Sequence, residues 1–264
     1  MKQELSYVFI CFAPLLGFAQ DGILVDGIFE DWSGYPTVYN DPGGDGGPSD
    51  VDFGTLQMNH DDAFLFFKLE IGTEINLQDY NAVALYLDTD NNSNTGLSMN
   101  GIGAELVYYF GERTGYFFYA GSEVEIDHED VFLITAPTVT SNVFEIAIHI
   151  DVAIAGIPVF QADTVKVVFH DDILSGDFLP DANESILYVL SDLELGLLPN
   201  YAIQKNPEVD IRVVSYNVLS NGFFEASRTE YFTRILQAIE PDIIGFQEIY
   251  DYTSSQVAFE IENM

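Results

Sequence analysis

The sequence of 264 residues has very little positive charge. It carries 8 lysine and arginine residues against 43 aspartate and glutamate residues, which gives a formal net charge of −35. Proteins grip nucleic acids chiefly through lysine and arginine side chains that displace counterions, so direct electrostatic binding of a phosphate backbone is excluded. Any contact with nucleic acid or phosphate would need metal ions as intermediaries.

Cysteine is almost absent, since Cys11 is the only one and it lies within MKQELSYVFICFAPLLGFAQ, residues 1–20. In this stretch Lys2 precedes an apolar run, and Gly17 and Ala19 stand at −3 and −1 of a predicted cleavage site. The pattern predicts a secretory signal peptide. A short membrane anchor is the alternative, but the run is short for a bilayer span and no second hydrophobic segment follows. We therefore expect a secreted protein without a membrane span, whose mature part uses no disulfides and no thiol nucleophile.

The histidines lack the spacing of a zinc site, and the chain does not have the composition of a disordered protein. The histidines are widely scattered, which does not fit a zinc site, and they are His60, His128, His149 and His170. Hydrophobic residues make up 48% of the chain and aromatic residues 14%, which suffices for packed cores in one or two domains. The chain is therefore expected to be globular.

Residues 22–190 have the pattern of an antiparallel β-sandwich. Short alternating or apolar runs are separated by clusters of Gly, Asn and Asp. In AFLFFKLEI, residues 63–71, bulky side chains fall on both faces, which predicts a central strand. The other strands expected in this region span residues 81–89, 103–111, 115–121, 143–151 and 163–171.

The segment DTDNNSNTG, residues 88–96, concentrates oxygen ligands behind one of these strands. Calcium takes six to eight oxygens from carboxylates, amides and backbone carbonyls, and Asp88, Asp90 and Asn92 offer several at alternate positions. The alternative is that Asp, Asn and Gly only serve the tight turn between two strands. Residues 40–52 are similarly rich in acidic and glycine residues.

Three stretches read together carry a family resemblance: VDGIFEDW (25–32), NHDDAFLFFKLEI (59–71) and ALYLDTDNNSNTGLSMNGIGAEL (84–106). Their order and spacing resemble the family-nine-type carbohydrate-binding modules and their DOMON-like relatives, which are β-sandwiches of secreted bacterial proteins. The resemblance covers residues 22–190 and implies a Ca²⁺ site at Asp88, Asp90 and Asn92, with a glycan as partner. Trp32, the only tryptophan, is expected to pack against the core, because it belongs to the first stretch.

The sequence changes character after residue 190. Residues 191–209 have no clean period and contain two turns with proline and asparagine, which predicts a linker. Residues 210–264 show a strand, an amphipathic helix and a second strand, which is a βαβ unit with parallel strands. The helix face expected to be buried consists of Tyr231, Ile235, Leu236 and Ile239. The fold class is therefore mainly β, with an antiparallel β-sandwich followed by an α/β fragment too small to fold alone.

The two strands of this fragment end in polar residues. SYNV (215–218) ends the first and FQEI (246–249) ends the second, so parallel pairing brings Asn217 and Glu248 to one edge. With Arg228 opening the helix, this combination resembles the start of the endonuclease/exonuclease/phosphatase superfamily, whose domain is a four-layer α/β sandwich. The resemblance implies that Asn217 contacts phosphate or the active-site water and that Glu248 binds Mg²⁺. The alternative is a turn residue and a solvated strand end.

The superfamily mechanism also uses an Asp-x-Asn pair and a terminal histidine with an aspartate near it, and residues 210–264 contain neither motif. We therefore expect the N-terminal fragment of a secreted, metal-dependent phosphodiester hydrolase of nuclease type, with the sandwich as an accessory module. The chain as given is expected to be inactive. The alternative function is a non-enzymatic, calcium-stabilised carbohydrate-binding or adhesion module.

Overall fold

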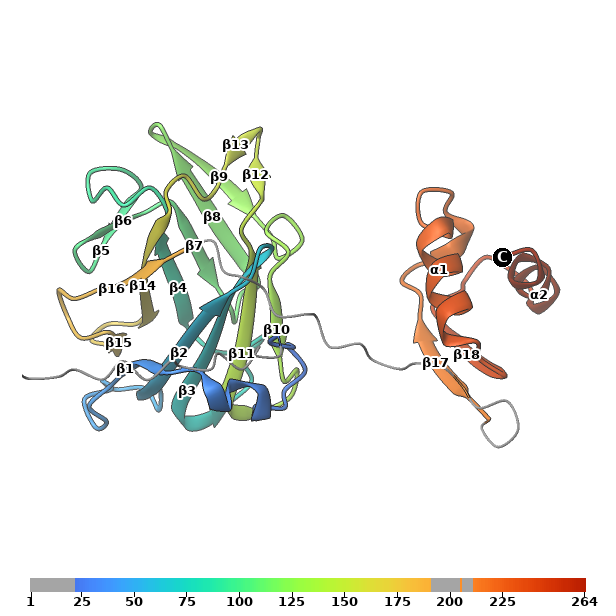
Figure 1. Cartoon of the computed structure of the whole chain (residues 1–264), viewed down its shortest axis with the longest axis horizontal. Coiled ribbons are helices and arrows are strands. Elements are labelled where there is room, and N and C mark those ends of the chain that lie inside the picture. The colour runs from blue at the N-terminus through green and yellow to red at the C-terminus, as the bar shows by residue number, and fades with distance from the viewer. Residues whose placement is uncertain (1–21, 191–204, 206–210) are drawn as a thin grey trace, which may run out of the picture. The chain divides into compact units, whose positions relative to one another are not determined.

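The computed structural model describes residues 22–190, 205 and 211–264 (Figure 1). The predicted signal peptide, and all of the predicted linker except Lys205, lie outside the described residues. The chain divides into two compact units, residues 1–199 and 200–264. None of the helices in the described ranges is long and apolar enough to cross a membrane.

Two antiparallel sheets build the first unit. The five-stranded sheet has the order β1 (Thr37–Asn40), β2 (Phe53–His60), β3 (Phe64–Ile75), β11 (Ser141–His149), β10 (Ile134–Ala136). The seven-stranded sheet has the order β15 (Phe178–Leu179), β14 (Thr164–Asp171), β4 (Val83–Asp88), β7 (Leu106–Tyr109), β8 (Thr114–Tyr119), β9 (Ser122–Ile126), and β16 (Ile186–Val189) also pairs with β14. The inner faces of both sheets share one hydrophobic core, so the predicted antiparallel β-sandwich is confirmed.

Short elements flank the two large sheets. They are the 3₁₀ helix η1 (Glu30–Gly34), the ribbon β5 (Leu97–Met99) with β6 (Ile102–Ala104), and the ribbon β12 (Ala153–Ile154) with β13 (Ile157–Pro158). The β5–β6 ribbon packs on the outer face of the seven-stranded sheet, where Ile102 and Ala104 join a small cluster with Tyr86. The outer faces are therefore partly apolar, as the bulky alternation in the sequence indicates.

Strand β3 shows how alternation produces the core. Phe67 points inward, is fully buried, and meets Phe169 of the other sheet edge to face with ring centroids 5.7 Å apart. Phe66 points to the opposite face, where it packs in a cluster with Trp32. Trp32 is completely buried, as expected, and its Nε1–H donates a 2.8 Å hydrogen bond to Glu145 Oε1. Both faces of β3 are thus covered, which confirms it as a central strand.

All six predicted strands overlap strands of the sandwich, namely β3, β4, β7, β8, β11 and β14. The run predicted over residues 103–111 is divided, because the chain leaves β6 and enters β7 at Glu105. The shorter strands β1, β10, β15 and β16 were not predicted, since two to four residues carry too little periodicity. The eight-residue strand β2 and the five-residue strand β9 are also absent from the prediction.

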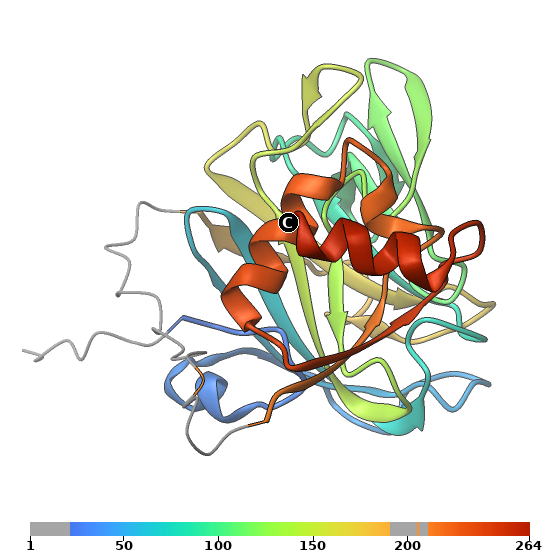
Figure 2. The ribbon, with the colours of Figure 1, turned by 90° about the vertical axis from the view of Figure 1, so that its right-hand side faces the viewer.

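The second unit contains β17 (Val213–Asn217), η2 (Gly222–Phe224), α1 (Thr229–Ile239), β18 (Ile243–Gln247) and α2 (Ser254–Glu262). Strands β17 and β18 pair in parallel with Asn217 opposite Gln247, as the βαβ prediction requires. Figure 2 shows these elements in orange and red from a second direction. Val257 and Ile261 of α2 join a cluster that includes Phe246 of β18.

Helix α1 is confirmed, but its predicted buried face is partly wrong. Phe232 and Leu236 are the buried residues, whereas Tyr231 and Ile235 are exposed. The reason is a long-range ring contact, since Phe232 packs on Tyr216 of β17 with centroids 5.3 Å apart. This contact rotates the helix relative to the face that spacing alone favours.

Candidate functional site

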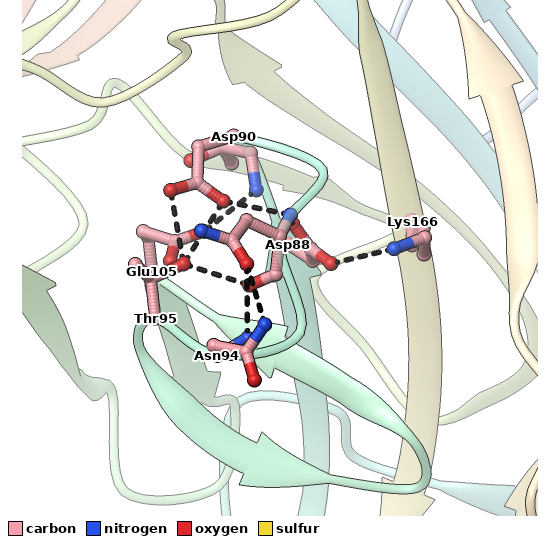
Figure 3. Close-up of polar contacts among 8 residues, drawn as sticks. Asp88, Asp90, Asn94, Thr95, Glu105 and Lys166 are labelled. Atoms are coloured by element: carbon pink, nitrogen blue, oxygen red, sulfur yellow. Dashed lines mark hydrogen bonds and ion pairs between the residues drawn. The ribbon is translucent and has the colours of Figure 1, made fainter.

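Three carboxylates lie together where β4 ends. Asp88 is the last residue of β4 and is fully buried, Asp90 follows in the loop, and Glu105 lies between β6 and β7 with 2% of its surface exposed. One oxygen of each carboxylate lies within 4.8 Å of the others (Figure 3). Antiparallel pairing of β4 with β7 brings Glu105 to this position.

The loop after β4 is tied to these carboxylates by hydrogen bonds. The Asn92 N–H lies 3.0 Å from Asp88 Oδ1 and 2.9 Å from Asp90 Oδ1. The Thr95 hydroxyl lies 2.9 Å from Asp90 Oδ2 and 2.7 Å from the Asn92 carbonyl oxygen, and its one proton can serve only one of them. The loop geometry therefore holds Asp88 and Asp90 in place through its backbone.

Glu105 has an oxygen that the protein does not satisfy. Its Oε2 accepts a 2.9 Å hydrogen bond from the Thr89 N–H, but the buried Oε1 has no hydrogen-bond partner among the described residues. Burial raises the pKa of Glu105, and the charges of Asp90 and Asp88 raise it further. A buried carboxylate oxygen without a donor is costly unless a cation lies beside it.

One lysine partly balances the charge of this group. Lys166 of β14 stands opposite Asp88 in the strand register, and its Nζ lies 3.0 Å from Asp88 Oδ2. Three ionised carboxylates and one ammonium leave a net charge of −2, which a single divalent cation would neutralise. Oxygen-only ligands of this kind are those that Ca²⁺ prefers.

The three predicted calcium ligands do not all lie in the carboxylate group. Asp88 and Asp90 belong to the carboxylate group, but the Asn92 side-chain oxygen is 3.1 Å from both the backbone N and the Nδ2 of Asn94. The Asn92 side chain thus serves the turn, as the alternative for this loop expects, and calcium binding by Asp88 and Asp90 stays a prediction. Glu105 was missed, although a lone glutamate within the apolar stretch GIGAELVYY is a signal that could have pointed to it.

A small pocket of about 240 Å³ lies at one end of the sandwich, beside β7 and β10. Its walls include the buried rings of Tyr108 and Phe110, and polar groups come from Gln78, Arg113 and Thr135. Gln78 Nε2 donates a 2.7 Å hydrogen bond to Thr135 Oγ1, and Arg113 Nε donates a 3.0 Å bond to the Gln78 carbonyl oxygen. The remaining lining residues are His128, Leu133 and Ile134.

In the second unit, the structure brings Asn217 and Glu248 together. Asn217 is the last residue of β17 and Glu248 directly follows β18, so the parallel register places both at one edge. Asn217 Nδ2 donates a 2.9 Å hydrogen bond to Glu248 Oε1, and the Ser220 N–H donates a 3.2 Å bond to Glu248 Oε2. Asn217 is exposed and Glu248 is half-buried, so a cation or phosphate could reach the pair from solvent.

The backbone around this pair is strained. Leu219, Ser220, Asn221 and Glu248 have φ values of 48°, 48°, 69° and 63°, a region that costs energy for residues other than glycine. Arg228 braces the segment, because its Nη1 and Nη2 each donate a 2.8 Å hydrogen bond, to the carbonyl oxygens of Leu219 and Val218. Strain of this kind collects at sites where side chains must be aimed.

No protein-family model matches the chain, and no curated protein matches it. Among solved structures, a family 9 carbohydrate-binding module from Caldicellulosiruptor kristjanssonii in complex with cellotriose is 11% identical, with a TM-score of 0.33 over 56% of this chain and 71% of that chain. Such a module from the same organism in complex with glucose is 12% identical, with a TM-score of 0.33 over 58% and 74%. The β-sandwich assignment rests on the strand pairing and the shared core of the first unit.

Proposed function

We propose that the first unit is a non-enzymatic carbohydrate-binding module. The observation that carries this proposal is the pocket, which combines the buried rings of Tyr108 and Phe110 with polar groups from Gln78, Arg113 and Thr135. The two rings belong to the core and are 2% exposed, so they form an apolar wall and not a stacking face. Amide, hydroxyl and guanidinium groups bind sugar hydroxyls, and pockets that combine apolar walls with a few polar groups fix small ligands. The formal net charge of −35 also favours a neutral ligand over an anionic one.

The size of the pocket limits the ligand. At about 240 Å³ it falls below the ~300–1,000 Å³ of pockets that enclose drug-sized ligands. A monosaccharide, or the terminal sugar of a longer glycan, is therefore the ligand class that we propose. Glucose and cellotriose, which the two similar solved modules hold, serve as the first probes.

Calorimetry with wild type and an Arg113→Met variant tests this assignment. We expect the variant to bind the sugar at least about tenfold more weakly, a loss of ~1.4 kcal/mol, because it lacks the guanidinium donors. The control is Tyr80→Ala, which removes a ring that is 97% exposed and does not line the pocket. Loss of binding in Tyr80→Ala with full binding in Arg113→Met would place the sugar on an exposed ring and refute the pocket.

We further propose that Asp88, Asp90 and Glu105 hold a structural Ca²⁺. The buried, unpartnered Oε1 of Glu105 supports this, as does the negative charge that Lys166 leaves uncompensated. The signal-like first twenty residues support secretion, and extracellular modules bind calcium at ~10⁻⁴–10⁻³ M. Calcium should raise the melting temperature read from Trp32 fluorescence, and Glu105→Gln should reduce this rise whereas Glu123→Gln, an exposed change on β9, should not. If calcium raises the melting temperature of Glu105→Gln as much as that of wild type, Glu105 does not bind the ion and this proposal is wrong.

A second candidate function belongs to the other unit. We propose that Asn217 and Glu248 are part of a metal-dependent phosphodiester hydrolase site, and the 2.9 Å contact between them supports it. Glu248 would hold Mg²⁺, which activates water and neutralises charge on a phosphoryl group when bound. Asn217 would orient a phosphate oxygen or the water. The sequence has no histidine after His170, so residues 211–264 offer no imidazole as a general base.

Metal binding and turnover test this candidate separately. Paramagnetic broadening by Mn²⁺, a spectroscopic substitute for Mg²⁺, should affect amide signals near Glu248, and Glu248→Gln should abolish the effect while Glu262→Gln retains it. We expect no Mg²⁺-dependent hydrolysis of bis(p-nitrophenyl) phosphate by the 264-residue chain. Equal broadening in Glu248→Gln would exclude the metal role, and turnover that Glu248→Gln abolishes would show that the base is present after all.

A further inference from the structure

A second group of carboxylates lies in a different loop of the sandwich. Asp41 directly follows β1, Asp45 lies in the loop that leads to β2, and Asp177 directly precedes β15. One oxygen of each lies within 4.8 Å of the others. The group shares no residue with the Asp88, Asp90 and Glu105 cluster.

Asp41 is the unusual member of this group. Only 7% of its surface is exposed, and neither carboxylate oxygen has a hydrogen-bond partner among the described residues. Its backbone N–H is satisfied by the Gly54 carbonyl oxygen at 2.9 Å, so the chain direction at this position is well defined. A buried carboxylate with both oxygens unsatisfied is costly for a protein, and it points to a partner that a protein side chain does not supply.

Asp177 is held rigidly beside Asp41. Its Oδ2 accepts a 2.6 Å hydrogen bond from the Phe53 N–H of β2, and its Oδ1 accepts a 2.8 Å bond from the Phe178 N–H of β15. These strands belong to different sheets. Asp177 therefore links the two sheets at the same place where Asp41 is buried.

The glycine-rich loop between β1 and β2 folds tightly and packs beside this carboxylate group. Asp52 Oδ1 accepts hydrogen bonds from the Gly44 and Gly46 N–H groups at 2.9 and 3.2 Å, which folds the loop into a tight turn. A side chain at Gly47 would collide with the Ser175 carbonyl oxygen, so the loop lies directly against the connection between β14 and β15. Asp45 remains exposed, which gives an ion access from solvent.

No positive side chain balances this group among the described residues. None of the ion pairs found there includes Asp41, Asp45, Asp52 or Asp177. Burial raises the pKa of Asp41 to about 7, and the charges of Asp177 and Asp45 act in the same direction. In the first carboxylate group, by contrast, Lys166 supplies an ammonium.

We propose that Asp41, Asp45 and Asp177 hold a second divalent cation, Ca²⁺, that fastens the loop between β1 and β2 to the connection between β14 and β15. The donors are all oxygens, which excludes the nitrogen and sulfur sets that select zinc or copper. Loop backbone and water complete the six to eight ligands that Ca²⁺ takes, and a glycine-rich loop adapts to that irregular geometry more easily than to the octahedron of Mg²⁺. The ion joins the two sheets outside their hydrophobic core.

Counting bound calcium in single variants of the full chain tests this proposal. Equilibrium dialysis of wild type should give one more bound Ca²⁺ than Asp41→Asn, and Asp45→Asn should weaken binding of that ion at least about tenfold. Asp45 is exposed, so its variant keeps the test valid if Asp41→Asn does not fold. The matched control is Asp50→Asn, an exposed aspartate of the same loop that lies outside the group.

Glu105→Gln separates this ion from the one proposed at Asp88 and Asp90. It should remove one ion and leave the Asp41 ion in place, while the double variant Glu105→Gln with Asp45→Asn should lose both. Amide exchange at Gly44 and Gly46 should slow at least about tenfold with calcium in Glu105→Gln, but not in Asp45→Asn. If Asp41→Asn and Asp45→Asn bind as much calcium as wild type, and calcium slows amide exchange at Gly44 and Gly46 as much as it does in wild type, the proposal is wrong. A protonated Asp41 would then be the reason that the group folds without a cation.

Discussion

The two units differ in how far they bury their charged and apolar side chains. In the sandwich, the inner-face residues of β3 and β14 are buried, and even Glu105 and Glu145 lie within the structure. In the second unit, β17 and β18 alternate between exposed and half-buried residues, and in the Asn217–Glu248 pair Asn217 is exposed and Glu248 is half-buried. Polar groups in the first unit are therefore placed by long-range packing, whereas those in the second are placed by the local register of two strands. Substitutions of buried residues in the first unit should therefore lower the free energy of unfolding more than substitutions in the second unit.

The largest effect is expected for Phe67→Ala in the sandwich core. Removing this ring, which is fully buried and contacts Phe169 of the other sheet, should lower the free energy of unfolding by ~3–5 kcal/mol. Trp32 is the only tryptophan, so urea unfolding followed by tryptophan fluorescence reports on this unit alone. The amide signals of α1 should remain unchanged if the units are stable independently.

The matched control is Phe232→Ala, which removes a buried ring from α1 in the second unit. It should leave the Trp32 transition where it is in wild type. A shift of that transition by Phe232→Ala would mean that the two units unfold as one, and the comparison between them would then fail.

A smaller effect is expected from the buried charge of Glu145. Burial raises its pKa above the ordinary value of 4.5, although the Gly27 N–H and Trp32 Nε1–H lower it in part. The folded state therefore binds the proton more tightly than the unfolded state. The cost of the charge is absent below about pH 4.5 and grows as the pH rises through the folded pKa, so stability falls with rising pH by at most ~1.4 kcal/mol per unit.

Glu145→Gln should remove that slope, because the amide keeps the shape of the side chain without its charge. Urea unfolding of both proteins in calcium-free buffer, from about pH 4 to about pH 7, should show wild type losing stability relative to the variant as the pH rises. Glu123→Gln on the exposed strand β9 is the control and should follow wild type. A constant difference between wild type and Glu145→Gln would contradict the raised pKa.

The sandwich could be predicted because its strands carry their own signals. Alternation in β3 indicated two covered faces, and Asp88 and Asp90 could be found from their spacing in one loop. Glu105 could not, because only the pairing of β4 with β7 brings it to the same place. The burial of Asp41 against Asp177 was equally hidden, since 136 positions separate them in the chain.

The second unit shows the converse. The meeting of Asn217 with Glu248 follows from parallel pairing of two strand ends, so the sequence alone predicted it. The buried face of α1 was predicted in part only, because ring packing between Phe232 and Tyr216 decides it. Spacing identifies a helix and its approximate face, while the contacts across the unit select the final rotation.

The smallest effect is expected at the start of α2. Thr253 and Gln256 form a capping box, in which the Gln256 N–H donates to Thr253 Oγ1 and the Thr253 N–H donates to Gln256 Oε1 at 2.9 Å. Thr253→Ala should destabilise the helix by ~1 kcal/mol, which speeds amide exchange in its first turn about fivefold. Ser255→Ala, in the same exposed turn but outside the box, should have no such effect. Because the helix end is local, the Trp32 transition should stay unchanged, and a shift there would show that even a surface cap in the second unit stabilises the sandwich.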